Sequence, residues 1–204
     1  GFYNGALGTI GNNSTASSGF NGIIDEVSVW NSEITPSDVA SIYNSGKPTD
    51  LSLLPTPPLN WYRMGDNGSY KSPQWLIPNN ENFANKVSNY SMVFDGIDDR
   101  VQLSSDFVAS GEFTLSFWMK PISAGSPISE IYPIGTFPGN SNYVKLVQIG
   151  VMWLRLGGVN AIFNEAVYGG GANNLVLNDW QNIVFIRDSS NVIRCYRNGV
   201  DFGY

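Results

Sequence analysis

Three aspartates lie close together in one short segment of the chain and could together hold a hard cation. They are Asp95, Asp98 and Asp99. Ca²⁺ prefers six to eight oxygen ligands, of which three carboxylates would supply a part. The same residues could instead make an ordinary turn, in which Asp95 forms an Asx-turn and the other two pair with Arg100 or cap backbone N–H groups. Both interpretations stay open, because the segment has no complete ligand set such as that of an EF-hand loop.

Residues suited to nucleophilic or acid–base catalysis are few. The chain has no histidine and one cysteine, Cys195, which removes the usual general base, the triads built on it and the commonest zinc ligand. We expect Cys195 to be a small strand residue. A glycosidase needs only two carboxyl groups, but the nearest acids, Asp25 and Glu26, are strand neighbours and should face opposite sides of a sheet. The sequence therefore predicts no enzyme, and glycoside hydrolysis is the remaining catalytic alternative.

Aromatic and guanidinium side chains on the outside of a strand could bind a sugar ring. Alternation along residues 114–120 places the apolar positions on a core face and Trp118 on the other face. The same alternation along residues 151–156 places Trp153 and Arg155 away from the core. The candidate ligand-binding residues are therefore Trp118, Trp153 and Arg155, of which the last two are the best placed. The alternative is that these tryptophans fill contacts within the sandwich.

Short β-strands must position these residues. Periodicity and β-branched or aromatic enrichment predict strands over residues 22–30, 91–94, 100–103, 113–120, 143–149, 151–156, 181–187 and 192–197. Residues 183–186 are apolar on both faces, which is typical of a central strand covered on both sides. One short helix is expected after the strand at 22–30, with Thr35 as its N-cap, Pro36 at its first position, Asp38 in a capping box and Gly46 near its end.

The composition favours an all-β fold. The chain has 22 Gly, 11 Phe, 10 Tyr and 6 Trp, and only 14% of its residues are charged, which indicates many strands joined by tight turns. We expect an antiparallel two-sheet jelly-roll sandwich with one short peripheral helix. The formal net charge of −6 argues against nucleic acid as a partner. No apolar run approaches the ~20 residues that cross a bilayer, so membrane insertion is not expected.

Several segments together carry a family resemblance. The run Ser91–Val101 followed by Phe113–Pro121 resembles the opening of laminin G-like modules of the concanavalin A-like lectin/glucanase superfamily. The runs Trp180–Phe185 and Arg194–Val200 are similar to the tryptophan-led strand and a late hairpin of these modules. The resemblance implies a concanavalin A-like sandwich. Some relatives bind calcium at the sandwich rim, which would suit the aspartates at 95, 98 and 99.

Residues 20–30 and the helix after them resemble the end of such a module. We therefore expect residues 1–46 to be the C-terminal part of one laminin G-like module, residues 47–60 to be a Pro-rich linker, and residues 61–204 to be the N-terminal part of a second module. The chain reads as an excerpt of a longer protein. Because jelly rolls of this family bring their chain ends together, the two parts could pack as one permuted sandwich.

The expected function is carbohydrate or cell-surface binding, in adhesion or recognition, by a module of a larger extracellular or phage virion protein. Residues 61–66 resemble the first strand of the second module, in a form typical of tandem modules of phage virion proteins and bacterial surface proteins. This resemblance points to an extracellular, cell-surface or virion location. The expected partners are a glycan or another host or cell-surface polymer, and neighbouring modules of the same polypeptide. Calcium is the one ion that the residues suggest. The alternatives are a structural spacer, and a glycoside hydrolase or its accessory domain.

Overall fold

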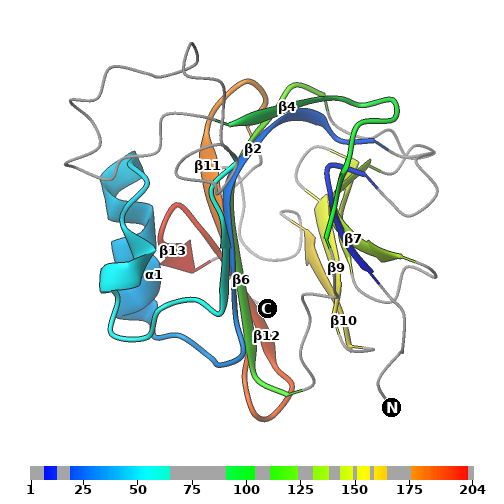
Figure 1. The fold of residues 1–204 in the computed structure, drawn as a ribbon. Helices are drawn as coiled ribbons and strands as arrows, with labels where there is room; N and C mark the ends of the chain where they lie inside the picture. Colours follow the sequence, from blue (N-terminus) through cyan, green and yellow to red (C-terminus); the bar gives the residue numbers. More distant parts are fainter. Residues whose placement is uncertain are drawn as a thin grey trace, which may run out of the picture.

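The computed structural model describes residues 7–12, 19–64, 91–103, 111–123, 131–137, 143–148, 151–156, 159–164 and 176–201. They form two antiparallel sheets and a helical layer against the outer face of one sheet (Figure 1). None of the helices in this part of the chain is long and apolar enough to span a membrane.

The elements follow one another in this order along the chain: β1 (Leu7–Ile10), β2 (Asn21–Trp30), α1 (Pro36–Tyr43), η1 (Asn44–Gly46), η2 (Leu51–Leu53), β3 (Asn60–Tyr62), β4 (Met92–Asp95), β5 (Val101–Gln102), β6 (Phe113–Pro121), β7 (Ile131–Phe137), β8 (Tyr143–Gln148), β9 (Val151–Leu156), β10 (Val159–Asn164), β11 (Gln181–Arg187), β12 (Ile193–Arg197) and β13 (Val200–Asp201).

The first sheet has seven strands, in the order β13-β12-β11-β6-β2-β3, with β4 also paired to β2. The long strand β2 pairs along one side with β6, with Val29 opposite Leu115. Its other side is shared between β3, which pairs with its second half, and β4, which pairs with its first half. Strand β2 is therefore an inner strand although it comes early in the sequence.

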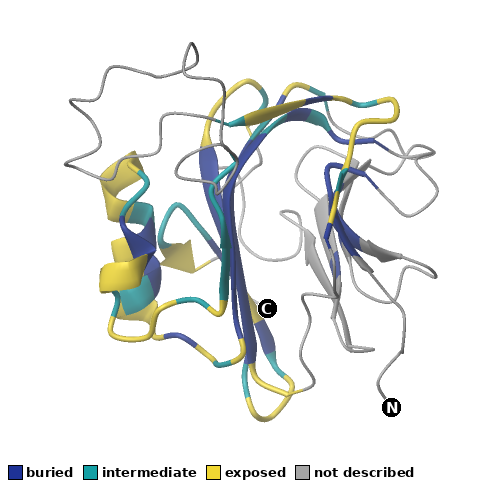
Figure 2. Ribbon diagram, in the orientation of Figure 1, coloured by how far each residue is buried: buried dark blue, intermediate teal, exposed yellow. Residues whose placement is uncertain are grey.

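The second sheet has six strands, in the order β10-β9-β8-β7-β1-β5. Here too an early strand lies inside the sheet, because β1 pairs with β7 on one side and with β5 on the other. The two sheets enclose the main hydrophobic core. Figure 2 shows in dark blue that most residues of the inner strands of the seven-stranded sheet are buried. Its members come from both sheets and include Leu115, Phe117, Phe185, Val144 and Leu154, all buried.

The outer face of the seven-stranded sheet is covered by α1 and the segment that follows it. The helix begins as the sequence predicts: the Thr35 side chain accepts a hydrogen bond from the Asp38 amide, Asp38 completes the capping box, and Pro36 occupies the first turn. It ends earlier than expected, at Tyr43, where Asn44 adopts the left-handed conformation. A second hydrophobic cluster lies under this layer and consists of Trp30, Ile34, Val39, Ile42, Leu51, Val184, Ile186 and Tyr196.

The predicted fold class is confirmed: the chain is an antiparallel two-sheet sandwich with a short helix. The alternation argument for residues 114–120 is also confirmed, since Leu115, Phe117 and Met119 are fully buried in the core. The prediction of a central strand that is apolar on both faces is confirmed as well, because Ile183 lies in the main core and Val184 in the second cluster. Four strands were not predicted: β1, β7, β10 and β13. The first two contain Gly or Pro within the strand, which lowers β-propensity.

The Pro-rich segment after the helix packs against the strands around it. Leu51 is 3% exposed, Trp30 Nε1 donates to the Thr56 carbonyl at 2.8 Å, and the Leu59 amide donates to the Val29 carbonyl. Residues on both sides of this segment contribute strands to both sheets. That these two parts derive from successive modules stays a prediction.

Candidate functional site

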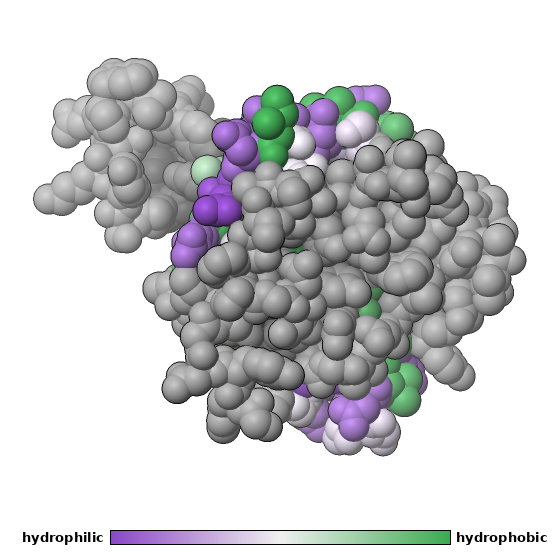
Figure 3. All heavy atoms as spheres, turned by 90° about the vertical axis from the view of Figure 1, so that its right-hand side faces the viewer, coloured by the Kyte–Doolittle hydropathy of each residue, from purple (hydrophilic) through white to green (hydrophobic). Residues whose placement is uncertain are grey.

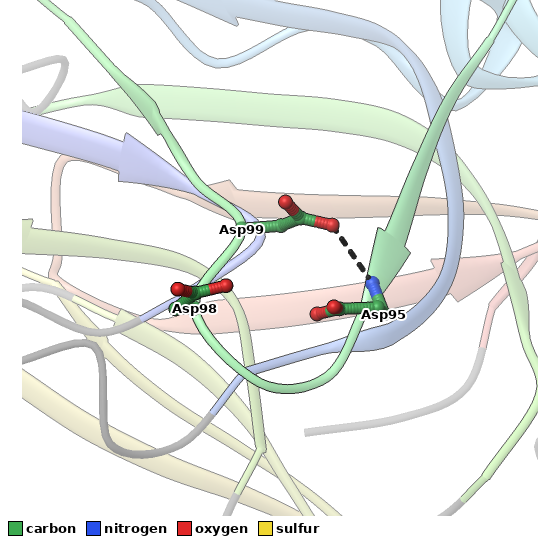
Figure 4. A group of neighbouring side chains, drawn as sticks. All are labelled: Asp95, Asp98 and Asp99. Carbon is green, nitrogen blue, oxygen red and sulfur yellow. Dashed lines mark hydrogen bonds between the residues drawn. The ribbon is translucent and has the colours of Figure 1, made fainter.

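The three predicted cation ligands come together at the turn between β4 and β5. One carboxylate oxygen of each of Asp95, Asp98 and Asp99 lies within 4.8 Å of the others, and all three residues are exposed. Figure 4 shows the side chains gathered on the turn, with Asp95 and Asp98 directed toward one another. The structure therefore brings these residues together as the spacing predicts.

The same aspartates also stabilise the turn itself. Asp95 Oδ1 accepts the Ile97 amide at 2.8 Å, which is the Asx-turn that the sequence offers as an alternative. Asp99 Oδ2 accepts the Asp95 amide at 3.1 Å (dashed in Figure 4). Each of these contacts uses one carboxylate oxygen and leaves the second oxygen of the group for other ligands.

The donor set suits a hard cation only in part. All the side-chain donors are carboxylate oxygens, the ligand type that Ca²⁺ prefers, but three carboxylates do not reach six to eight ligands unless water, backbone carbonyls or a bound molecule supply the rest. Asp95, Asp98 and Asp99 are therefore the residues that would hold a calcium ion, in a site that keeps positions open to solvent.

Residues from the amino-terminal part of the chain brace this turn. Asn12 Nδ2 donates to the Ile97 carbonyl at 3.3 Å, and Asn21 pairs with Asp95 in the ladder between β2 and β4. Gly19 lies against the backbone of the turn, so close that a Cβ at this position would be 2.5 Å from the Gly96 carbonyl carbon. A larger residue at 19 would push the turn out of place.

Exposed apolar side chains flank the acidic turn. Val93 is 66% and Ile97 is 69% exposed. Figure 3 views the molecule from the side of the six-stranded sheet and shows hydrophobic and hydrophilic residues side by side along the upper rim. Such a mixed rim offers both polar ligands and apolar contact area to a bound molecule.

Trp118 occupies a different position from the one expected of a sugar-binding residue. It lies on the face opposite the main core, as alternation predicts, but it is only 4% exposed. Its ring stacks on Tyr43 of α1, with the ring centroids 6.0 Å apart. Trp118 is therefore a packing residue between sheet and helix. The prediction that it binds a ligand is corrected, because the sequence did not reveal that the helix covers this face.

The other two candidates lie on β9. The register places Trp153 opposite Lys145 of β8 and Ile162 of β10, and Arg155 opposite Tyr143 and Asn160. The side chains of Trp153 and Arg155 lie outside the part of the structure that is described, and their role stays a prediction.

The expectation that Asp25 and Glu26 face opposite sides of the sheet is wrong. The ladder between β2 and β6 shifts register between Asp25 and Ser28, and Glu26 has a positive φ of 51°, which is typical of a β-bulge. Asp25 pairs with Trp118, and Glu26 lines the same small hollow as Trp118 and Ile42. Both acids therefore lie on the helix side, and alternation fails because the bulge adds one residue.

Glu26 belongs to a buried cluster that sequence reasoning did not find. It is 3% exposed, and its carboxylate accepts hydrogen bonds from Trp61 Nε1 and, at 3.3 Å, from Arg63 Nε. The Arg63 guanidinium also lies 4.7 Å from the centre of the Trp61 ring, in cation–π geometry. The cluster joins β3 and the residue after it to the bulge in β2. No motif signals it, because bulges depend on the tertiary partner.

Cys195 has the structural role that the sequence suggests. It is fully buried in the main core. Burial raises the pKa of the thiol well above its usual value, and the nearby Asp201 carboxylate raises it further, while Arg197 lowers it. The thiol is therefore protonated at neutral pH and is a poor nucleophile.

Comparison with known proteins identifies a family. A laminin G family model, described as the concanavalin A-like lectin/glucanases superfamily, matches residues 95–203, which is more than half of the chain. No match was found among curated proteins or among solved structures. The matched segment begins at the acidic turn and includes strands of both sheets, from β5 to β13. The chain belongs to the concanavalin A-like lectin/glucanase superfamily.

Proposed function

We propose that this protein is a binding module that recognises a carbohydrate or another polymer of a cell surface, and that calcium at the acidic turn contributes to recognition. Membership of the superfamily supports a lectin-like or other binding module in general terms. The observation that carries the finer proposal is the convergence of Asp95, Asp98 and Asp99 on one exposed turn at the rim of the sandwich.

The geometry of the turn explains how it would bind a sugar. A calcium ion held by the three carboxylates would have coordination positions left for vicinal hydroxyl groups of a sugar, since Ca²⁺ readily accepts neutral oxygen ligands. The exposed Val93 and Ile97 would contact the apolar face of the ring. The bracing by Asn12 and Gly19 holds the turn in place before any ligand arrives, which lowers the entropic cost of binding.

A second contact area is proposed on the outer face of the six-stranded sheet. Leu154 and Val144 are buried in the core, so alternation places positions 153 and 155 of β9 on the opposite face. An aromatic and a guanidinium residue at these positions would give a polymer chain a stacking surface and a hydrogen-bond donor. An adhesive role in a larger extracellular or virion protein follows from such binding.

Calorimetric titration and a glycan array test the proposal. Chelator-treated protein is titrated with CaCl₂ and then applied to the array with and without calcium. We expect calcium binding, and glycan or cell-surface binding that weakens at least tenfold when calcium is removed. Asp98→Asn should abolish both, whereas Glu33→Gln, which removes the same charge from an exposed loop beyond the far end of β2, should change neither.

Two results would overturn the proposal in different ways. If no calcium binds, or if Asp98→Asn binds it as the unchanged protein does, the metal part is wrong. If no polysaccharide or cell surface is bound in either condition, the role of a structural spacer replaces that of a binding module.

A further inference from the structure

The two earliest strands of the chain are inner strands of the two different sheets. We name residues 7–12 and 19–64 the amino-terminal unit, which contains β1, β2, α1 and β3, and residues 91–201 as far as they are described the carboxy-terminal unit. Strand β1 separates β7 from β5, and β2 separates β6 from β4. Removing the amino-terminal unit would thus open both sheets in the middle.

The backbone ladders show how closely the two units fit. In the seven-stranded sheet Ile24 of β2 pairs with both Met92 of β4 and Met119 of β6. In the six-stranded sheet Ile10 of β1 pairs with both Val101 of β5 and Ile134 of β7. Each inserted strand therefore satisfies backbone groups on two neighbours, and without it these groups would be left as sheet edges, which are templates for pairing with another chain.

The hydrophobic contacts repeat this pattern. The second cluster is shared between the units: Trp30, Val39 and Ile42 of the amino-terminal unit pack with Val184 and Ile186 of β11. In the main core Ile24 and Val29, both buried, pack among residues of β6 and β11. Because β1 and β2 lie in different sheets, the amino-terminal unit cannot complete a sandwich by itself, and each unit depends on the other for its interior.

The covalent connection between the units is long. Residues 65–90 join Met64 to Ser91, and a chain of this length could span up to ~90 Å when extended. A compact domain of 204 residues has a radius of gyration of about 17 Å, so its diameter is roughly 40 Å. The chain is thus long enough for its amino-terminal unit to reach the carboxy-terminal unit of another molecule.

We propose that the amino-terminal unit of a second copy of this chain can take the place of the molecule's own unit. Its β2 would pair with β6 and β4, and its β1 would pair with β7 and β5, so these strand edges form an interaction surface. Every copy presents the same strands, so the exchanged contacts are identical to those within one molecule. The balance between monomer and exchanged dimer therefore depends on the protein concentration and on the entropy of the linker. The product is a strand-exchanged dimer in which each sandwich contains β1 and β2 of the other copy.

Complementation between two defective full-length chains tests the proposal. Ile24→Asp places a charge in the fully buried centre of β2 and disables the chain as a donor, and Leu115→Asp does the same to β6 and disables it as an acceptor. Each variant refolded alone should lack a cooperative thermal transition. Refolded together in equal amounts, they should form a heterodimer with one intact sandwich and regain about half of the near-ultraviolet circular dichroism of the unchanged protein.

A matched control uses two donor defects. Ile24→Asp refolded with Val29→Asp, which is also buried in β2, should regain nothing, because neither chain brings an intact β2. If the mixture of donor-defective and acceptor-defective chains behaves as the sum of its parts, or if the control pair is rescued equally well, strand exchange is refuted.

The unchanged protein provides a second measurement that needs no substitution. Isotope-labelled and unlabelled chains are unfolded, mixed and refolded at increasing concentration, and the products are analysed by light scattering and native mass spectrometry. We expect a dimer fraction that increases with concentration and contains mixed-mass dimers, which do not form when folded samples are simply combined. A monomer at every concentration overturns the proposal.

Discussion

Replacing Arg63 with methionine should destabilise the sandwich strongly, because it removes the cation beside a buried carboxylate. Glu26 is 3% and Arg63 11% exposed at the side chain. Removing one partner of a buried ion pair typically costs about 3–5 kcal/mol. Methionine keeps the apolar stem, and Trp61 Nε1 still donates to Glu26, so we expect the lower end of this range, about 3 kcal/mol.

Urea unfolding followed by tryptophan fluorescence measures this effect. With a denaturant slope of about 2–3 kcal/mol/M, the midpoint of Arg63→Met should fall by about 1–1.5 M. The double variant Glu26→Gln/Arg63→Met should recover most of the loss, because a neutral amide can accept the Trp61 hydrogen bond without a cation beside it. The matched control is Lys47→Met, an exposed cation, which should stay within about 0.5 kcal/mol.

The reasoning would be refuted by either of two results. A loss below about 1 kcal/mol for Arg63→Met would show that the guanidinium is not needed to keep the Glu26 carboxylate in the interior. A double variant as unstable as the sum of the two single variants would show that the two residues do not interact.

Three further outcomes are expected. Leu115→Ala, at a fully buried position of β6, should lower the free energy of unfolding by about 2–5 kcal/mol. Urea titration measures this change, and a loss below about 1 kcal/mol would contradict the assignment of Leu115 to the core. The Cys195 thiol, whose pKa is raised by burial, should react with Ellman's reagent at pH 8 only after denaturant is added. Burial also raises the pKa of Tyr62 and Tyr196 above 10.0. The unfolded state therefore loses these phenolic protons first, so stability should be full below about pH 10 and fall above it, and Tyr62→Phe should make the fall in the urea midpoint shallower.

Alternation of apolar residues predicted the layers of this fold well, because burial of one face fixes the register of a strand. The core positions of β6 and the two-sided strand β11 follow directly from it. It failed where the backbone departs from a regular strand. The bulge at Glu26 places two consecutive acids on one side, and strands such as β7, which contain Pro and Gly, are held by their neighbours and not by their own propensity.

The candidate site was predictable in its residues but not in its surroundings. Residue type and spacing were enough to group Asp95, Asp98 and Asp99, because three carboxylates on one short turn lie close to one another. The bracing by Asn12 and Gly19 comes from a segment some eighty residues away, so only the tertiary structure reveals it. The covering of Trp118 by Tyr43 was missed for the same reason.

The early position of β2 in the sequence has a consequence for synthesis in the cell. Its partner strand is distant: Ser28 Oγ donates to the carbonyl of Ser116, 88 residues later. At translation rates of about 5–20 residues per second, β2 would wait roughly 4–18 s on the ribosome before β6 is made. During this time β2, whose Ile24, Val27 and Val29 are buried in the finished fold, lacks its partner strand β6. We therefore expect the nascent chain to be a client of chaperones that shield such segments until the later strands emerge.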